Sequence, residues 1–234
     1  MAPSTDRHNM LGSLYLRIAC TKAKRVDVVA RVKDAEKEFL KAANLEKNIT
    51  PESQEDPTRG IQFSRPAWDV GQYAGFRWNL CRILVALIDK NENQEFKPQE
   101  LETWCQRMTQ IAAGRDKLEP SFWTAAWCGH MPFLTLLLQY NEILSLQVDL
   151  AKKTLEEEHR QELQSDLDKR MDKVKKLHSD TILAYHKAIA RGCSPRNLIS
   201  LKEQITVAIE ILRRSERDTN DLCTMLNQIC EQII

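Results

Sequence analysis

Hydrophobic residues recur every three to four positions along most of this 234-residue chain, and that spacing predicts a protein built from α-helices. Two N-terminal segments, near 9–22 and 25–44, show the pattern. The second segment has one face that we expect to be buried, formed by Val28, Val29, Val32, Ala35, Phe39, Leu40 and Ala43.

The strongest periodicity lies in the C-terminal third. From Leu198 onward two hydrophobic positions repeat every seven residues over five heptads, which is typical of a coiled-coil seam. The seam is weakened only at Ser215 and Thr219. We therefore predict one long helix from 195 to 234, whose seam binds a partner protein or a neighbouring helix through Leu198, Leu201, Ile205, Leu212, Leu222, Leu226, Ile229 and Ile233.

A second long helix is predicted before it, over about 141–190. Between the two stands R-G-C-S-P-R, in which Gly192 suits a helix C-terminus, Ser194 an N-cap and Pro195 a first helical turn. This stop-and-start signal predicts that the two helices fold back on one another as an antiparallel hairpin.

Aromatic residues divide the chain into parts. All five tryptophans lie between 68 and 127, and bulky rings are typical of a compact core. We expect an all-α fold with a Trp-rich helical core and a projecting, coiled-coil-like C-terminal hairpin. The predicted parts are N-terminal helices (1–46), a polar loop (47–67), the Trp-rich core (68–140) and the long hairpin (141–234).

Charge and cysteine content limit the binding partners and the cellular compartments that we expect for this chain. The net charge of +1 gives no global field that would attract nucleic acid or an anionic membrane. The beginning of the chain lacks the apolar run of a signal peptide, and no apolar stretch is long enough to span a membrane. Seven scattered cysteines without a C-x-x-C pair favour an intracellular, disulfide-free protein, cytoplasmic or alternatively nuclear.

The stretch D-K-N-E-N-Q-E-F-K-P-Q-E resembles a calcium-binding EF-hand loop. The resemblance implies oxygen ligands from Asp89, Asn91, Asn93, Glu95 and Glu100. However, Gln94 replaces the glycine of the sharp turn, and Lys97 places a cation beside the ion. We expect a polar helix–helix connection here, and a calcium-responsive adaptor is an alternative reading.

The segment from Pro120 to Leu138 resembles one ankyrin repeat in its A-A-x-x-G-H pattern and the apolar run that follows. No neighbouring repeat follows at the usual period, and a lone repeat cannot bury its own faces. The segment therefore predicts a tight pair of apolar helices rather than a repeat array.

Candidate catalytic chemistry is sparse. The histidines form no compact metal-binding pattern, and we expect His178 and His186 to be solvated on the long helix. Cys128 and His130 lie close in sequence, but their apolar surroundings favour a buried cysteine and a structural histidine over a catalytic pair. We expect no enzyme activity and no cofactor.

A basic cluster makes the first 45 residues the most positive part of the chain. On adjacent helices these residues could follow a phosphate backbone, and they are Arg17, Lys22, Lys24 and Arg25. An RNA-binding, nucleocapsid-like protein is therefore a further alternative. The reading that we favour is a non-enzymatic scaffold that binds proteins, or itself, through the C-terminal hairpin.

Overall fold

The computed structural model describes residues 4–45, 65–89, 96–152 and 156–233. Within these ranges the chain forms eight α-helices and no strand, which confirms the all-α prediction. The helices are α1 (Thr5–Thr21), α2 (Arg25–Leu45), α3 (Arg65–Ile88), α4 (Pro98–Leu118), α5 (Phe122–Leu150), α6 (Glu157–Ala190), α7 (Pro195–Leu212) and α8 (Asn220–Gln232).

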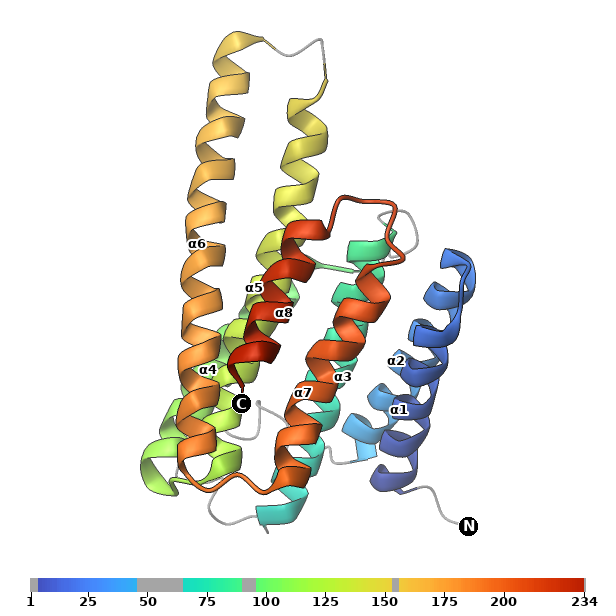
Figure 1. Cartoon of the computed structure of the whole chain (residues 1–234), viewed down its shortest axis with the longest axis vertical. Helices are drawn as coiled ribbons and strands as arrows, with labels where there is room; N and C mark the ends of the chain where they lie inside the picture. The colour runs from blue at the N-terminus through green and yellow to red at the C-terminus, as the bar shows by residue number, and fades with distance from the viewer. Residues whose placement is uncertain (1–3, 46–64, 90–95, 153–155, 234) are drawn as a thin grey trace.

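The arrangement is a bundle with one projection (Figure 1). The antiparallel pair α5–α6 forms the most extensive helix contact, and the upper part of this pair rises beyond the other helices. Helices α1 and α2 lie on the opposite side, and α3 links them to α5 and α7. The core runs through the lower part of the bundle, where α3, α5, α7 and α8 bury most of their apolar residues.

The N-terminal helices follow the prediction closely. Ser4 caps α1 by accepting a hydrogen bond from the amide of Arg7, and α2 covers nearly the predicted range. The buried face of α2 is the predicted one except at its end, where Ala42 is buried and Leu40 and Ala43 are only partly covered.

The predicted stop-and-start signal is confirmed. Helix α6 ends at Ala190, and Gly192 has a φ of 96°, a backbone conformation that glycine adopts without steric cost. Ser194 then accepts a hydrogen bond from the amide of Asn197 at 3.2 Å, and Pro195 is the first residue of α7.

The predicted helix over 141–190 is wrong, because the chain turns between Leu150 and Glu157. The residues around this turn are mostly good helix formers without glycine or proline, so sequence propensity gives no stop signal. The turn lets α6 pack antiparallel on α5, with Leu167 and Met171 partly buried against the core. A continuous rod would leave those side chains without apolar neighbours.

The single helix predicted over 195–234 is also wrong, because it breaks between Leu212 and Asn220. The break includes the two weak seam positions. Ser215 donates to the carbonyl of Leu87, and Thr219 donates to the carbonyl of Leu212. Polar side chains at these positions bond backbone carbonyls more favourably than they would pack in an apolar seam.

The predicted hairpin of two long rods therefore does not form. Helix α6 pairs with α5, and α8 returns to lie along α6 in the same direction. Two imidazole Nε2 atoms of α6 bond to α8, His178 to the carbonyl of Met225 at 3.2 Å and His186 to the carbonyl of Gln232 at 2.6 Å. His178 is half-buried, which corrects the expectation of a solvated side chain for that residue, whereas His186 is exposed as expected although it also bonds α8.

Arg217 anchors the α7–α8 connection to the core. Its guanidinium donates to the carbonyl of Ala86 at 3.1 Å and to the Asn141 side-chain oxygen at 2.7 Å. It also reaches the Ser145 hydroxyl at 3.4 Å. These bonds join the α7–α8 connection to the end of α3 and to the C-terminal part of α5, so one side chain holds the point at which the predicted helix breaks.

An aromatic cluster fills the contact between α5 and α6. His130 is stacked on Phe76 with ring centroids 4.4 Å apart, and its Nδ1 lies 2.9 Å from the hydroxyl of Tyr185. Trp127 meets His130 edge-on. A Cβ atom added at Gly129 would lie 2.4 Å from the Tyr185 ring, so only glycine allows the two helices this approach.

Helix α5 also corrects the prediction of a helix pair over 120–138. It runs without interruption from Phe122 to Leu150 and includes Pro132 in its interior. The ankyrin-like pattern thus lies within a single helix. The polar loop predicted over 47–67 lies outside the described residues except for 65–67, which belong to α3. Among the described helices none is both long enough and apolar enough to cross a membrane.

The close contact at Gly129 gives a first prediction. Replacing Gly129 with alanine should lower the free energy of unfolding by about 1–3 kcal/mol, because the new methyl group overlaps the Tyr185 ring. The control is Gly75→Ala, where the added atom would lie 3.6 Å from Trp104; we expect no loss there and a gain of up to about 1 kcal/mol. Urea unfolding followed by circular dichroism distinguishes the two, and equal effects would contradict the proposed contact.

The role of Arg217 gives a second prediction. Arg217→Ala should cost about 2–3 kcal/mol of unfolding free energy, because half-buried acceptors on α3 and α5 lose their donor. Arg213→Ala is the matched control, since Arg213 is exposed at the end of α7 and its ion pair among the described residues is the local one with Glu210. Thermal unfolding of both variants measures the difference; a mild loss at Arg217 similar to the loss at Arg213 would argue against an anchoring role.

Candidate functional site

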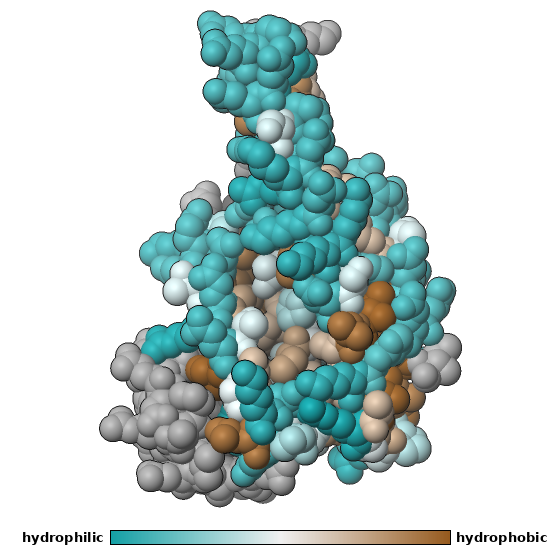
Figure 2. Space-filling model, turned by 90° about the vertical axis from the view of Figure 1, so that its left-hand side faces the viewer, coloured by the Kyte–Doolittle hydropathy of each residue, from teal (hydrophilic) through white to brown (hydrophobic). Residues whose placement is uncertain are grey.

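An open groove of about 580 Å³ lies between α4, α5 and α6. Figure 2 shows this side of the molecule, hollowed below the hydrophilic projection, with paler and apolar atoms visible between hydrophilic rims. The residues that line the groove are spaced three or four apart on each helix, except that α4 contributes the adjacent pair Thr109 and Gln110: Glu102, Gln106, Thr109 and Gln110 on α4, Cys128, Pro132 and Thr135 on α5, and Lys173, Leu177 and Asp180 on α6.

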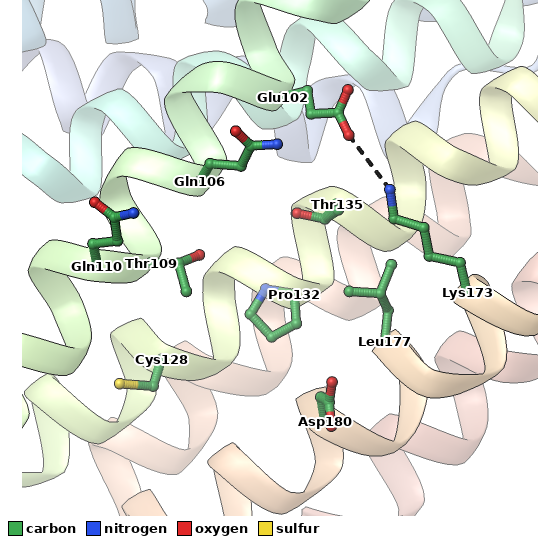
Figure 3. A pocket seen from close by; sticks show the side chains of 10 residues that line it. All are labelled: Glu102, Gln106, Thr109, Gln110, Cys128, Pro132, Thr135, Lys173, Leu177 and Asp180. Carbon is green, nitrogen blue, oxygen red and sulfur yellow. Dashed lines mark hydrogen bonds and ion pairs between the residues drawn. The ribbon is translucent and has the colours of Figure 1, made fainter. Parts of the chain in front are cut away.

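The floor of the groove belongs to α5, and it includes Pro132, which removes one hydrogen bond from this continuous helix. Pro132 has no amide hydrogen, so the carbonyl of Cys128 cannot accept the usual helical bond from residue 132. Pro132, Cys128 and Thr135 are each partly exposed along this floor (Figure 3). Leu177 reaches beside Pro132 from α6 and extends the apolar strip.

The walls of the groove come from α4 and α6, which make little direct contact. They are tied together at one end by an ion pair of 3.4 Å between Glu102 and Lys173 (Figure 3). Both side chains are well exposed, so this pair contributes little to stability. The polar side chains of Gln106 and Gln110 line the wall on the α4 side.

A stronger link joins the other ends of the same helices at Asp116. This carboxylate is 5% exposed, accepts a hydrogen bond from Lys187 at 2.6 Å and is paired with Arg191. The hydroxyl of Thr124 donates to it at 3.1 Å. Burial alone would raise the pKa of Asp116, but the bonds from Arg191, Lys187 and Thr124 outweigh it and lower that pKa below its ordinary value.

Cys128 and His130 face different surroundings although they are two residues apart. Burial raises the pKa of the Cys128 thiol, with the charge of Asp116 acting in the same direction, so the thiol stays protonated. Burial lowers the pKa of His130 to about 3, so the imidazole is neutral within the aromatic cluster. Cys128 lines the groove and is only partly buried, which corrects the expectation of a buried cysteine.

The predicted seam residues lie in the protein's own core. Seven of the eight are buried, and Leu198 is partly covered. They belong to two helices, so they do not form one continuous seam. Their role in binding a partner stays a prediction, and it requires α7 or α8 to leave the core.

The basic cluster is partly engaged by carboxylates of its own chain. Arg17 pairs with Glu203 at 2.6 Å, and Arg25 pairs with Glu216 at 2.6 Å and Asp89 at 3.2 Å. Lys22 is half-buried and Lys24 is exposed at the α1–α2 junction. Nucleic-acid binding by these residues stays a prediction.

The predicted calcium ligands are described only at the two ends of the loop. Asp89 faces Arg25, and Glu100 pairs with Lys97 at 3.0 Å. Asn91, Asn93 and Glu95 lie outside the described residues. Elsewhere in the part of the chain that the structure describes, histidines, cysteines and acidic residues form no group of three that could hold a metal ion.

The groove was missed by reasoning from sequence. The α4 wall could have been predicted, because Glu102, Gln106 and Gln110 form a polar row at four-residue spacing. Nothing in the sequence indicates that α5 and α6 supply the other two rows, since that depends on the turn after Leu150.

No protein-family model matches this chain, and comparisons with curated proteins and with solved structures find no match either.

The Asp116 network gives a third prediction, on pH dependence. Asp116→Asn should lower the free energy of unfolding by about 1–3 kcal/mol near neutral pH, because Lys187 and Arg191 lose their shared carboxylate. The folded-state pKa is lowered, so this stabilisation is complete above the unfolded pKa of about 4 and is lost as the pH falls through the folded value.

Urea unfolding at several pH values tests this. The gap between the wild type and Asp116→Asn should be constant from neutral pH to about 5 and should narrow below about 4. Asp172→Asn is the control, since Asp172 is exposed and its pair with Lys175 is expected to contribute little at any pH. A gap that is independent of pH would show that the Asp116 charge has no part in stability.

Proposed function

We propose that this chain is a non-enzymatic interaction protein, and that the α4–α5–α6 groove receives an amphipathic helix of a partner protein. The observation that carries the proposal is the three rows of side chains at helical spacing that face one open groove. The proposal keeps the scaffold function expected from sequence and changes the surface that performs it.

The dimensions and chemistry of the groove support a helical occupant. Each row covers seven or eight residue steps, or about 10–12 Å at a rise of about 1.5 Å per residue, which is the length of two helical turns. An apolar strip at Pro132 and Leu177 suits hydrophobic anchors at i and i+3 or i+4. The amides of Gln106 and Gln110 suit polar groups at the edge of such a helix.

The proposal that the protein is not an enzyme rests on the protonation states of Cys128 and His130. The thiol of Cys128 is held protonated by burial, and the neutral imidazole of His130 bonds Tyr185 inside the core. A thiol needs an adjacent base to become a nucleophile, and these two residues do not provide that arrangement.

Site-specific cross-linking tests the proposal and gives a fourth prediction. A photo-reactive residue placed at Gln110, in cells that naturally produce the protein, should cross-link one partner protein. The same residue at Thr103, which is exposed on α4 outside the groove, should not. Thr109→Arg should reduce the Gln110 cross-link at least about tenfold, because a long cation fills the groove without changing the core.

Equal cross-linking from Gln110 and Thr103, or a Gln110 product that Thr109→Arg leaves unchanged, would show that the groove is not the docking site. Circular dichroism of Thr109→Arg checks that the fold is intact, and we expect no change because Thr109 is exposed.

A further inference from the structure

Helix α6 carries a strip of charges with an unusual order. Six exposed residues, each three or four positions from the next, lie along one side of the helix: Glu158, Glu162, Asp166, Lys169, Lys173 and Lys176. The first three are acidic and the last three are basic. We call these six residues the α6 charge strip.

This order is self-complementary in one direction only. When two copies of α6 lie antiparallel, Glu158 faces Lys176 of the second copy, Glu162 faces Lys173 and Asp166 faces Lys169. All three pairs are centred near residue 167, so they form in a single register. A twofold axis near residue 167 relates the two copies, as in an isologous dimer. A parallel arrangement would place like charges together.

Intrachain effects do not account for the order. The pairs Glu158–Glu162, Glu162–Asp166 and Lys169–Lys173 have like charges at i,i+4, which disfavours an isolated helix. The helix dipole favours acidic residues only in the first turn and basic residues only in the last. The three lysines instead lie near the middle of the helix Glu157–Ala190.

The strip is exposed along its length; its acidic half lies on the projection, whereas Lys173 lies beside α4 at the end of the groove. Helices α5 and α6 rise past the rest of the bundle in the projection, and its visible face is hydrophilic (Figures 1 and 2). Among the described residues the strip takes part in exposed intrachain pairs: Glu162 with His159 at 3.5 Å, Asp166 with Lys169 at 3.4 Å and Lys173 with Glu102 at 3.4 Å. Such pairs exchange readily for intermolecular ones.

We propose that the α6 charge strip is a self-association surface, and that its partner is the same strip of a second copy of this chain. The strip has no large apolar residue at its centre, so the dimer is weak, rapidly exchanging and salt-sensitive. The proposal does not require a partner in the groove, although Lys173 belongs to both surfaces.

The test uses full-length chains with exchanged charges and gives a fifth prediction. One variant carries Glu158→Lys, Glu162→Lys and Asp166→Lys, and the other carries Lys169→Glu, Lys173→Glu and Lys176→Glu. Each variant alone should be monomeric in sedimentation equilibrium, because its strip has a single sign. An equimolar mixture should restore a dimer, because the two strips are again complementary.

The wild type should dimerise at about 20 mM salt, and the dissociation constant should rise at least about tenfold at about 500 mM. A control variant with Lys24→Glu, Lys37→Glu and Lys117→Glu changes the net charge by the same amount as the variant in which the three strip lysines become glutamate. These control lysines are exposed on other surfaces, so the control should dimerise like the wild type. Replacing the three strip lysines with glutamine should also abolish the dimer, and this milder variant serves if a reversed variant fails to fold.

Three results would overturn the proposal. The first is a wild type that stays monomeric at low salt, and the second is a mixture of the two reversed variants that stays monomeric. The third is a control variant that loses the dimer as the reversed variants do, because net charge would then explain the result.

Discussion

The close approach of α5 and α6 at Gly129 and Tyr185 is the contact on which the rest of this structure depends. The missing side chain at Gly129 lets the Tyr185 ring lie directly on the α5 backbone, and the tyrosine hydroxyl satisfies the buried imidazole of His130. The two longest helices are thereby joined over their lower halves. Their upper halves extend together as the projection, and their outer faces supply the floor and one wall of the groove.

Buried or half-buried arginines hold the remaining helices against this pair. Arg77 of α3 donates to Gln204 of α7 at 3.2 Å and to Ser13 of α1 at 2.6 Å, and it lies over the Phe39 ring of α2. Arg217 makes the corresponding links between the α7–α8 connection, α3 and α5. A planar guanidinium offers several donors in fixed directions, so one such residue can bond three helices at once.

The two proposed surfaces differ in physical character. The groove combines an apolar strip with amide and carboxylate edges, which suits a specific and stable helical ligand. The α6 charge strip is polar and exposed, which suits a weak association controlled by ionic strength. Both surfaces use α6, and Lys173 belongs to both, so occupation of one affects the electrostatics of the other.

The sequence alone determined the all-α class, the N-terminal helices, and the helix boundary at Gly192, Ser194 and Pro195, because each depends on local backbone and capping chemistry. It did not locate the turn after Leu150, whose neighbourhood consists of helix formers, nor the break near Ser215, whose stabilising acceptor is the distant Leu87 carbonyl. Only tertiary packing decided which stripes meet: the heptad residues joined the core of their own chain, and the groove arose from three helices whose pairing no local pattern encodes.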